Sequence, residues 1–303
     1  MTLRVAQSAL SHSALLGLQA NLARLQSTQE QLSSGRRVNR MSDSPVDGAA
    51  AMRLRGEQSA NEQIGRNIAD GLSTLGAADG TFTSMSAMLQ RVRQLVVSGL
   101  NETNGPNQRE AIAAEVDQLK SGLLGLANTQ YLGRPVFAGT QDVTAAFDTT
   151  TGQYLGNASP VQRSVSTDSS ATLDVTVTGQ ATFTTLFSDS GDALGAGILT
   201  RISAALRAPG GPATLDTELS NLDSASATVQ NARSMVGARY NRLLSVQGAG
   251  ETRLDSLTTS LSLAENIDLT KTIIDMQIQT TGYQAALGAA AKIIQPSLLD
   301  FLR

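Results

Sequence analysis

The sequence contains no cysteine and no tryptophan, and its one histidine is His12. Without cysteine, the chain can form neither a disulfide bond nor a thiolate metal site, and it offers no thiol nucleophile. A single histidine cannot by itself build a histidine metal site or a catalytic triad. We therefore expect His12 to be an exposed or interfacial helix residue rather than a ligand or a base, and we expect no metal and no cofactor.

Aromatic residues are also scarce, at 3% of the 303 residues, whereas an enzyme of this length usually anchors its core and pocket with more rings. The glycine spacing of Walker and dinucleotide-binding loops is absent from the sequence. Glu57, Glu62 and Asp70 could form a carboxylate set, but solvated helix faces explain these residues better. These observations favour a protein that is not an enzyme.

The formal net charge is only −3, so no domain-wide basic field is available to bind nucleic acid or anionic lipid. The longest apolar runs fall far short of the ~20 residues that a membrane helix needs. The segment Met1–Leu10 lacks the apolar stretch of a cleavable secretory signal. We expect no nucleic-acid partner, no membrane partner and no signal cleavage.

The composition changes twice along the chain. Residues 1–130 are rich in Ala, Leu, Gln and Arg, residues 131–212 are rich in Thr, Ser, Gly, Asp and Val, and residues 213–303 return to the first kind. This order predicts helices, then a β-rich insert, then helices again. The fold class that we expect is mainly α with a small β insert (α+β).

Apolar residues in the helical parts recur in steps of three and four, which places them on one stripe of each helix. Such a stripe is narrow and must be covered by another helix, so the pattern predicts a long antiparallel helical bundle or coiled-coil rod. The stripes comprise Leu15, Leu18, Leu22, Leu25 and Leu32, then Leu75, Phe82, Leu89 and Val96, and then Leu215, Leu222, Val229, Val236, Tyr240 and Leu243.

Local signals set the boundaries of several elements. Ser44-Pro45 predicts a helix start, with Ser as the cap and Pro at the first helical position. The segment 104–107 predicts a turn between two antiparallel helices. In the insert, residues 172–178 and, more weakly, 161–165 predict strands, and Thr151-Gly152 predicts a hairpin turn.

Both ends of the chain are amphipathic helical segments that cannot bury their stripes alone. Either the two ends pair with each other, or they await other molecules. The apolar tail 295–303 is a further candidate contact, although it could also fold back on its own chain. The candidate assembly-interface residues are Leu15, Leu18, Leu22, Leu25, Ile274, Ile278, Leu287, Ile293, Leu298, Leu299 and Phe301.

Several motifs resemble those of the flagellin family. Residues 32–39, Leu-Ser-Ser-Gly-Arg-Arg-Val-Asn, and the Ser-Asp-Ser-Pro of residues 42–45 are similar to the family's N-terminal signature. Residues 66–73 and 89–95 resemble the blocks that follow, in the same order. The resemblance covers about residues 1–140 and 215–303, and the centre of the chain more loosely.

Within that family, the sequence leans towards the members that form the junction between hook and filament. Residues 131–139, Tyr-Leu-Gly-Arg-Pro-Val-Phe-Ala-Gly, resemble the junction members' block and not the Phe-Asn-Gly block of filament subunits. Residues 152–157 and 162–165 resemble the β domain of the same members. The last residues, Leu-Leu-Asp-Phe-Leu-Arg, instead resemble the terminal Leu-Arg of flagellins. A short flagellin that forms the filament itself is therefore the alternative.

The resemblance implies a structural protein of the bacterial flagellum, exported unfolded by the type III apparatus. It implies self-association in a helical layer, contacts with a neighbouring hook-associated junction protein and with flagellin, and an export chaperone. The implied domains are residues 1–44 and 267–303 for an inner coiled-coil domain, 45–134 and 213–266 for a helical rod, and 135–212 for a β-rich outer domain.

A carbohydrate-binding surface protein is a less favoured reading of the insert. Phe147, Tyr154, Phe183 and Phe187 could form a platform for a sugar ligand. A small sheet also needs apolar residues in order to fold at all, and we favour the interpretation that these four rings form its core.

Overall fold

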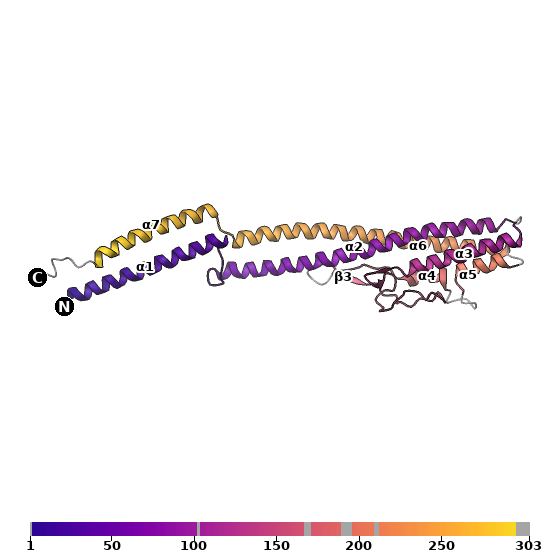
Figure 1. Ribbon diagram of the computed structural model, residues 1–303, viewed down its shortest axis with the longest axis horizontal. Coiled ribbons are helices and arrows are strands. Elements are labelled where there is room, and N and C mark those ends of the chain that lie inside the picture. Colours follow the sequence, from indigo (N-terminus) through magenta and orange to yellow (C-terminus); the bar gives the residue numbers. More distant parts are fainter. Residues whose placement is uncertain (1, 102–103, 167–170, 189–195, 209–211, 295–303) are drawn as a thin grey trace. The chain divides into compact units, whose positions relative to one another are not determined.

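The computed structural model describes residues 2–101, 104–166, 171–188, 196–208 and 212–294 (Figure 1). Its helices are α1 (Thr2–Ser34), α2 (Pro45–Gly99), α3 (Pro106–Ala127), α4 (Gly179–Phe187), α5 (Ile198–Arg207), α6 (Pro212–Glu265) and α7 (Leu269–Ile294). The fold is therefore mainly helical, as the composition predicts.

The strands among the described residues form two small antiparallel pairs. β1 (Gln130–Tyr131) pairs with β2 (Arg134–Pro135), and β3 (Gln162–Ser164) pairs with β4 (Thr172–Asp174). In the second pair Arg163 lies opposite Leu173. The coarse prediction of an α fold with a small β content is confirmed.

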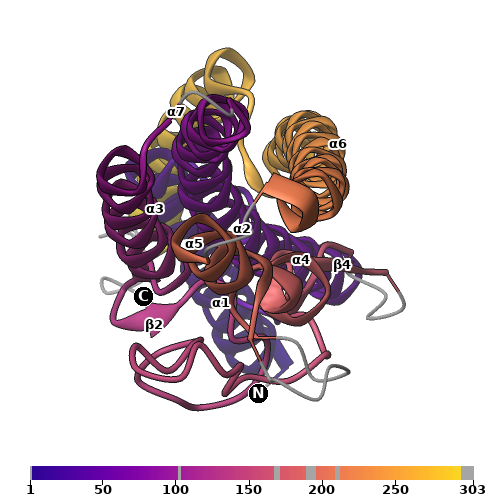
Figure 2. The same ribbon diagram turned by 90° about the vertical axis from the view of Figure 1, so that its right-hand side faces the viewer.

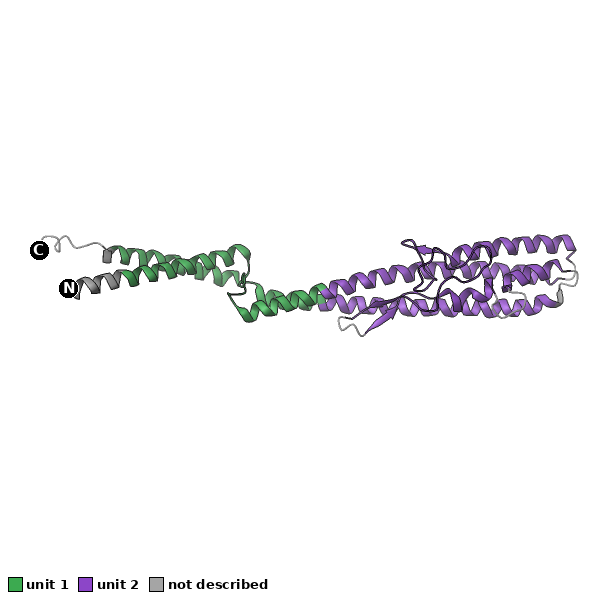
Figure 3. Cartoon of the chain, turned by 90° about the horizontal axis from the view of Figure 1, so that it is seen from below, with its two compact units in different colours: residues 1–59, 254–303 green, residues 60–253 purple. Residues whose placement is uncertain are grey.

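The chain divides into two compact units (Figure 3). Unit 1 comprises Met1–Ser59 and Leu254–Arg303, and unit 2 comprises Ala60–Arg253. Helices supply most of both units: α1 and α7 lie in unit 1, α3, α4 and α5 lie in unit 2, and α2 and α6 have residues in each.

Two helices begin where the sequence predicts. α2 begins at Pro45, and the Asp47 N–H in its first turn donates to the Ser44 hydroxyl at 3.4 Å. α3 begins at Pro106, where the Gly105 N–H donates to Gln108 Oε1 at 3.1 Å. These bonds satisfy polar groups that a helix start leaves without intrahelical partners.

The core of unit 2 lies between the helices and the segment that follows α3. Figure 2 shows α3, α5 and α2 beside one another, and Arg91 of α2 pairs with Glu115 of α3 at 2.7 Å. The α2 stripe is fully buried, as predicted: its members Leu75, Ala78, Phe82, Met85, Leu89, Val92 and Val96 are at most 1% exposed. On α6, Leu215, Leu222, Val229, Val236 and Leu243 are buried, but Tyr240 is 36% exposed, so its place on that stripe was wrong.

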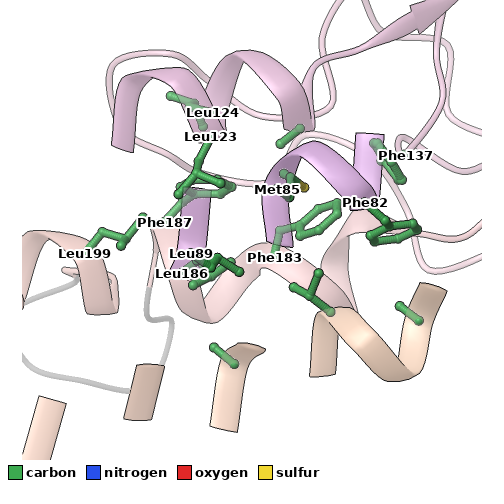
Figure 4. Close-up of a cluster of buried hydrophobic side chains, with 14 of the residues drawn as sticks. Phe82, Met85, Leu89, Leu123, Leu124, Phe137, Phe183, Leu186, Phe187 and Leu199 are labelled. Atoms are coloured by element: carbon green, nitrogen blue, oxygen red, sulfur yellow. The ribbon is translucent and has the colours of Figure 1, made fainter. Parts of the chain in front are cut away.

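A cluster of aromatic rings joins this core to the central segment (Figure 4). The ring of Phe137 lies 5.5 Å from that of Phe82 on α2 and 5.0 Å from that of Phe183 on α4, both edge to face. Phe147 lies 5.4 Å from Phe187 in the same manner. Edge-to-face pairs at these distances stabilise the fold beyond the burial of their apolar area. These phenylalanine rings therefore help to hold the central segment against the helices of unit 2.

The prediction of a β-rich segment at residues 135–212 needs correction, because α4 and α5 lie within it. Strand β4 ends at Asp174, whereas the alternation of residues 172–178 predicted a strand through all of them. The buried residues Phe183, Leu186 and Phe187 recur at helical spacing, as do Ile198, Leu199 and Ile202. The helical period of these buried residues agrees with the observed structure, whereas the β-branched composition of the segment predicted strands.

The predicted hairpin at Thr151-Gly152 is confirmed. Phe147 and Tyr154 form an antiparallel bridge, and the Leu155 N–H donates to the Ala146 carbonyl at 2.9 Å. Gly152 has a φ of +72°, a left-handed conformation that glycine adopts without steric cost. The weaker strand predicted at residues 161–165 is also present, as β3.

Candidate assembly surface of the terminal helices

The first and last helices of the chain pack against each other within unit 1 (Figure 1). The Thr28 hydroxyl donates to Gln279 Oε1 at 2.8 Å, and nearer the other end of the pair the Ile267 N–H donates to the Gly35 carbonyl at 3.2 Å. The residue numbers rise on α1 as they fall on α7, so the two helices are antiparallel. The two ends of the sequence therefore pair with each other.

The seam between the two helices follows a heptad pattern. Its residues recur in steps of four and three on both helices, and all of them are buried or half-buried. We call this set the closed stripe: Ala14, Leu18, Asn21, Leu25, Thr28 and Leu32 on α1, and Thr272, Met276, Gln279, Tyr283, Ala286 and Ala290 on α7.

Two of the three buried residues of the closed stripe are the polar Thr28 and Thr272, and the third is Ala290, which is 5% exposed. Thr28 is 7% exposed and Thr272 is 8% exposed, whereas Leu18 and Leu25 beside them are only half-buried. The Thr28 hydroxyl lies within bonding distance of both Gln279 Oε1 and the Arg24 carbonyl, and the Thr272 hydroxyl donates to the Asp268 carbonyl. These polar groups are satisfied, but they bury little apolar area.

Larger apolar side chains of the same helices are left facing solvent. Leu15 is 50% exposed, Ile274 is 53% exposed and Ile278 is 64% exposed. Ile274 and Ile278 each follow a closed-stripe residue by two positions, about 200° around the helix at ~100° per residue, so they lie on the opposite face of α7. We call Leu15, Leu22, Ile274, Ile278 and Leu287 the open set.

The structure separates the candidate interface residues into three groups. Leu18 and Leu25 lie in the closed stripe, and the five members of the open set are exposed. The side chains of Ile293, Leu298, Leu299 and Phe301 lie outside the residues that the structure describes. One antiparallel partner can cover only one face of a helix. The pairing of α1 with α7 therefore buries part of the predicted stripe and leaves the open set exposed.

A shallow apolar groove on α7 adds to the open set. It is lined by Gln277, Ile278, Thr281, Gly282 and Ala285. Sequence reasoning missed this groove, because it singled out only large apolar residues. The small side chains at Gly282 and Ala285, one turn apart beside Ile278, were the signal that could have revealed it.

The other candidate residues do not come together into a site. His12 is exposed. Asp70 pairs with Arg163 at 2.8 Å, and Glu57 pairs with Arg53 one turn before it at 3.6 Å. Across the described part of the chain, no group of three or more His, Cys, Asp or Glu residues is arranged to hold a metal ion.

The four aromatic residues of the insert do not form a ligand platform. Phe147 and Phe183 are fully buried, and Phe187 is 2% exposed. The Tyr154 hydroxyl lies 2.9 Å from the Phe137 carbonyl and 2.8 Å from the Asn157 carbonyl, so its polar end is engaged within the fold. The favoured interpretation, in which these rings form a small core, is confirmed.

None of the helices, as far as their residues are described, has an apolar stretch long enough to cross a membrane.

Comparison with known proteins connects this geometry to the flagellum. Residues 5–142 match the family model of the bacterial flagellin N-terminal helical region. Flagellar hook-associated protein 3 of Escherichia coli (strain K12) is 26% identical over 278 residues, which cover 86% of this chain and 87% of that protein. A flagellin of Clostridium tyrobutyricum is 33% identical, but over only 40% of this chain and 32% of its own length.

Two further relatives match over long stretches. The flagellar filament 30.7 kDa core protein of Treponema maltophilum is 27% identical over 91% of both chains. A solved structure described as a flagellar hook-associated protein from Vibrio parahaemolyticus has a TM-score of 0.64 and 26% identity, covering 74% of this chain and 99% of that one.

The chain is similar to flagellin-like proteins of the bacterial flagellum. Within that class it resembles hook-associated protein 3, with which it matches over nearly the full length of both chains.

Proposed function

We propose that this protein is a structural adaptor at the junction between the flagellar hook and the filament. The observation that carries the proposal is the likeness to hook-associated protein 3 over 86% of the chain, whereas the flagellin of Clostridium tyrobutyricum matches over 40% of it. The helical fold with an open apolar face at its paired ends supports a role in packing rather than in catalysis.

The open set is the surface through which we propose that the protein assembles. Burying one leucine or isoleucine side chain contributes about 1.5–3 kcal/mol, and Leu15, Leu22, Ile274, Ile278 and Leu287 are all partly available for burial. Contacts between copies that do not close on themselves generate helical layers. Leu298, Leu299 and Phe301 of the tail, with Ile293, extend the proposed surface towards the C-terminus.

The proposed partners are those that the likeness to hook-associated protein 3 and to flagellin implies. Further copies of this chain lie beside it in a layer, a neighbouring hook-associated protein lies on one side of the layer, and flagellin lies on the other, where the layer acts as a template. The proposal places the protein outside the cell, exported without signal cleavage and with the help of a chaperone. Residues 1–44 and 267–303 form the inner coiled-coil domain, residues 45–134 and 213–266 a helical rod, and residues 135–212 an outer domain.

Locating the protein on intact flagella tests this function. Immunogold labelling with an antibody raised against residues 135–207 is expected to mark one spot at the base of each filament. The same antibody on cells that lack the gene serves as the control for specificity. Label along the whole filament would contradict the junction role.

A filament-forming flagellin is the second candidate, and one comparison favours it specifically. The filament core protein of Treponema maltophilum matches 91% of this chain. Seeded polymerisation separates the two functions. A filament subunit grows long filaments from purified protein, whereas a junction adaptor stops after about one layer or requires its neighbour.

A further inference from the structure

Two breaks in the helices of unit 1 meet each other. α1 ends at Ser34 and α2 begins at Pro45, while α6 ends at Glu265 and α7 begins at Leu269. Arg36 and Asn266 form an isolated antiparallel bridge between the two breaks. We call residues 35–44 and 264–268 the joint, because each break is hydrogen-bonded to the other.

Arg37 is the donor in three polar contacts at the joint. Its backbone N–H donates to the Glu265 carbonyl at 2.6 Å, and its guanidinium Nη2 donates to the Ala264 carbonyl at 3.0 Å. Its other terminal nitrogen, Nη1, lies 2.9 Å from the Asp47 carboxylate. One residue therefore binds the last carbonyls of α6 and the first turn of α2.

The side chain of Arg37 donates to acceptors that carry full or partial negative charge. The last carbonyls of a helix have no intrahelical donors and carry partial negative charge, so a guanidinium at that end stabilises them. The Asp47 oxygen that meets Arg37, Oδ2, also accepts from the Ser44 hydroxyl at 2.8 Å, and that bond, together with Arg37, lowers the pKa of the Asp47 carboxyl group. The planar fork of arginine reaches two acceptors in fixed directions, which the single ammonium of lysine does not.

Other charged groups enclose the joint. The Glu265 side chain is only 7% exposed and binds Arg55 of α2 at 2.7 Å, with Arg36 at 3.8 Å. The guanidinium of Arg40, by contrast, pairs with Glu30 at 3.5 Å, and these two side chains are 71% and 57% exposed. The loop 35–44 thus contains one arginine that connects helix ends and another that makes an ordinary surface pair.

We propose that Arg37 is a positioning residue: by binding the end of α6 and the start of α2 together, it fixes the direction in which α1 and α7 leave the joint. Arg37 belongs to the Gly-Arg-Arg motif of residues 35–37, to which the assembly surface assigns no role. The consequence for assembly rests on the proposed function, since the joint then sets how the open set is presented to a neighbour. The positioning itself belongs to the isolated chain.

A distance measurement between spin labels on α1 and α2 tests the positioning directly. Because the chain has no cysteine, Gln19→Cys and Ser59→Cys introduce two unique labelling sites, both exposed and both in unit 1. The doubly labelled parent protein is expected to give one narrow distribution of distances by pulsed electron resonance. Arg37→Gln is expected to broaden that distribution, with the helix content by circular dichroism unchanged.

Three further variants define the result. Arg40→Gln is the matched control in the same loop and is expected to leave the distribution narrow. Arg37→Lys keeps the charge without the fork, and Asp47→Asn removes the carboxylate charge with which Arg37 pairs at the start of α2. Both are expected to broaden the distribution. If the distribution stays narrow in both of these variants and in Arg37→Gln, the positioning role is overturned. Should Arg37→Gln fail to fold, Asp47→Asn and Arg37→Lys decide the question.

Failure of the positioning role and failure of the proposed function are distinguishable. The spin-label experiment uses the isolated chain and does not depend on where the protein lies on the flagellum. Immunogold labelling of cells that carry Arg37→Gln then measures the consequence, with an expected loss of the junction spot. Retention of the spot together with a broadened distribution would separate the joint from assembly and overturn that consequence alone.

Discussion

Thr28 on α1 and Gln279 on α7 form a hydrogen bond of 2.8 Å across the closed stripe, at positions where a coiled coil usually carries apolar side chains. Thr28 is 7% exposed, and its hydroxyl also lies 3.0 Å from the Arg24 carbonyl of its own helix. A polar pair of this kind weakens the association of two helices and in exchange specifies one register. The contact between α1 and α7 is therefore expected to have a well-defined register and a modest free energy of association.

Replacing this pair should therefore strengthen the seam and loosen its register. We expect Thr28→Val combined with Gln279→Leu to raise the thermal unfolding temperature, because apolar area replaces a hydrogen bond of small net value. Spin labels at Gln19→Cys and Gln284→Cys should at the same time give a broader distance distribution than in the parent. Gln26→Leu, an exposed change on α1, is the control and should alter neither measurement. An equally narrow distribution in the double variant would show that the polar pair does not set the register.

The open set yields a prediction about assembly without loss of stability. Leu22 is 39% exposed and Ile278 is 64% exposed, so Leu22→Glu and Ile278→Glu should change the free energy of unfolding by no more than about 0.5 kcal/mol. A neighbour that buries either position would instead meet an unpaired charge, which is costly. We expect folded protein in urea titrations but no incorporation into flagella. Gln19→Glu, exposed on the same helix as Leu22, adds the same charge and should assemble normally; full motility of the Ile278→Glu strain would remove this face from the interface.

The pairing of helices could be predicted from sequence because the seven-residue spacing of Leu75, Phe82, Leu89 and Val96 is a property of the chain alone. The same reasoning could not divide the terminal stripes. Leu15, Leu18, Leu22 and Leu25 lie on one ladder in sequence, yet Leu18 and Leu25 are half-buried, whereas Leu15 and Leu22 are exposed. Which residues of a ladder are sealed depends on where the partner helix lies, and local spacing does not contain that information.

The central segment was harder to predict for a different reason. The β-branched residues between Thr172 and Thr178 indicate a strand, but β4 ends at Asp174. The Val175 N–H makes one further bond, to the Val161 carbonyl at 2.8 Å, and Val177 is buried between β4 and α4. Asp268 lies just before α7 and accepts a bond from the Lys271 N–H at 3.1 Å, so a single polar residue marks a helix start within a segment of helical composition. Composition describes a segment on average, and single turns and caps override it.

The aromatic cluster should account for a large part of the stability of unit 2. Phe82 is fully buried and lies 5.5 Å from Phe137 and 5.7 Å from Phe183. Phe82→Ala removes these contacts and leaves a cavity, which should lower the free energy of unfolding by about 3–5 kcal/mol. Met235→Ala, at a 51% exposed position of α6, is the control and should stay within about 0.5 kcal/mol. Urea unfolding followed by circular dichroism measures both, and a small effect at Phe82 would mean that the cluster is loosely packed.

The hydroxyl of Tyr154 should make unit 2 sensitive to alkali. Burial raises the pKa of Tyr154 from 10.0 to about 12, against an opposing effect of the Gly179 and Gln180 backbone. A folded state with the higher pKa holds its proton more tightly than the unfolded chain, so the stabilisation is complete below pH 10 and is lost as the pH rises towards 12. We expect the urea midpoint of the parent to fall across this window.

Tyr154→Phe separates this titration from general alkaline unfolding. The variant loses the hydrogen bonds of the hydroxyl to the Phe137 and Asn157 carbonyls, so it should be less stable than the parent at neutral pH by about 1 kcal/mol. It has no proton to release at this position, and its midpoint should therefore fall less steeply between pH 10 and pH 12 than that of the parent. Parallel slopes for the two proteins would mean that Tyr154 ionises without affecting the fold, and that the hydroxyl is more accessible to water than its contacts with Phe137 and Asn157 indicate.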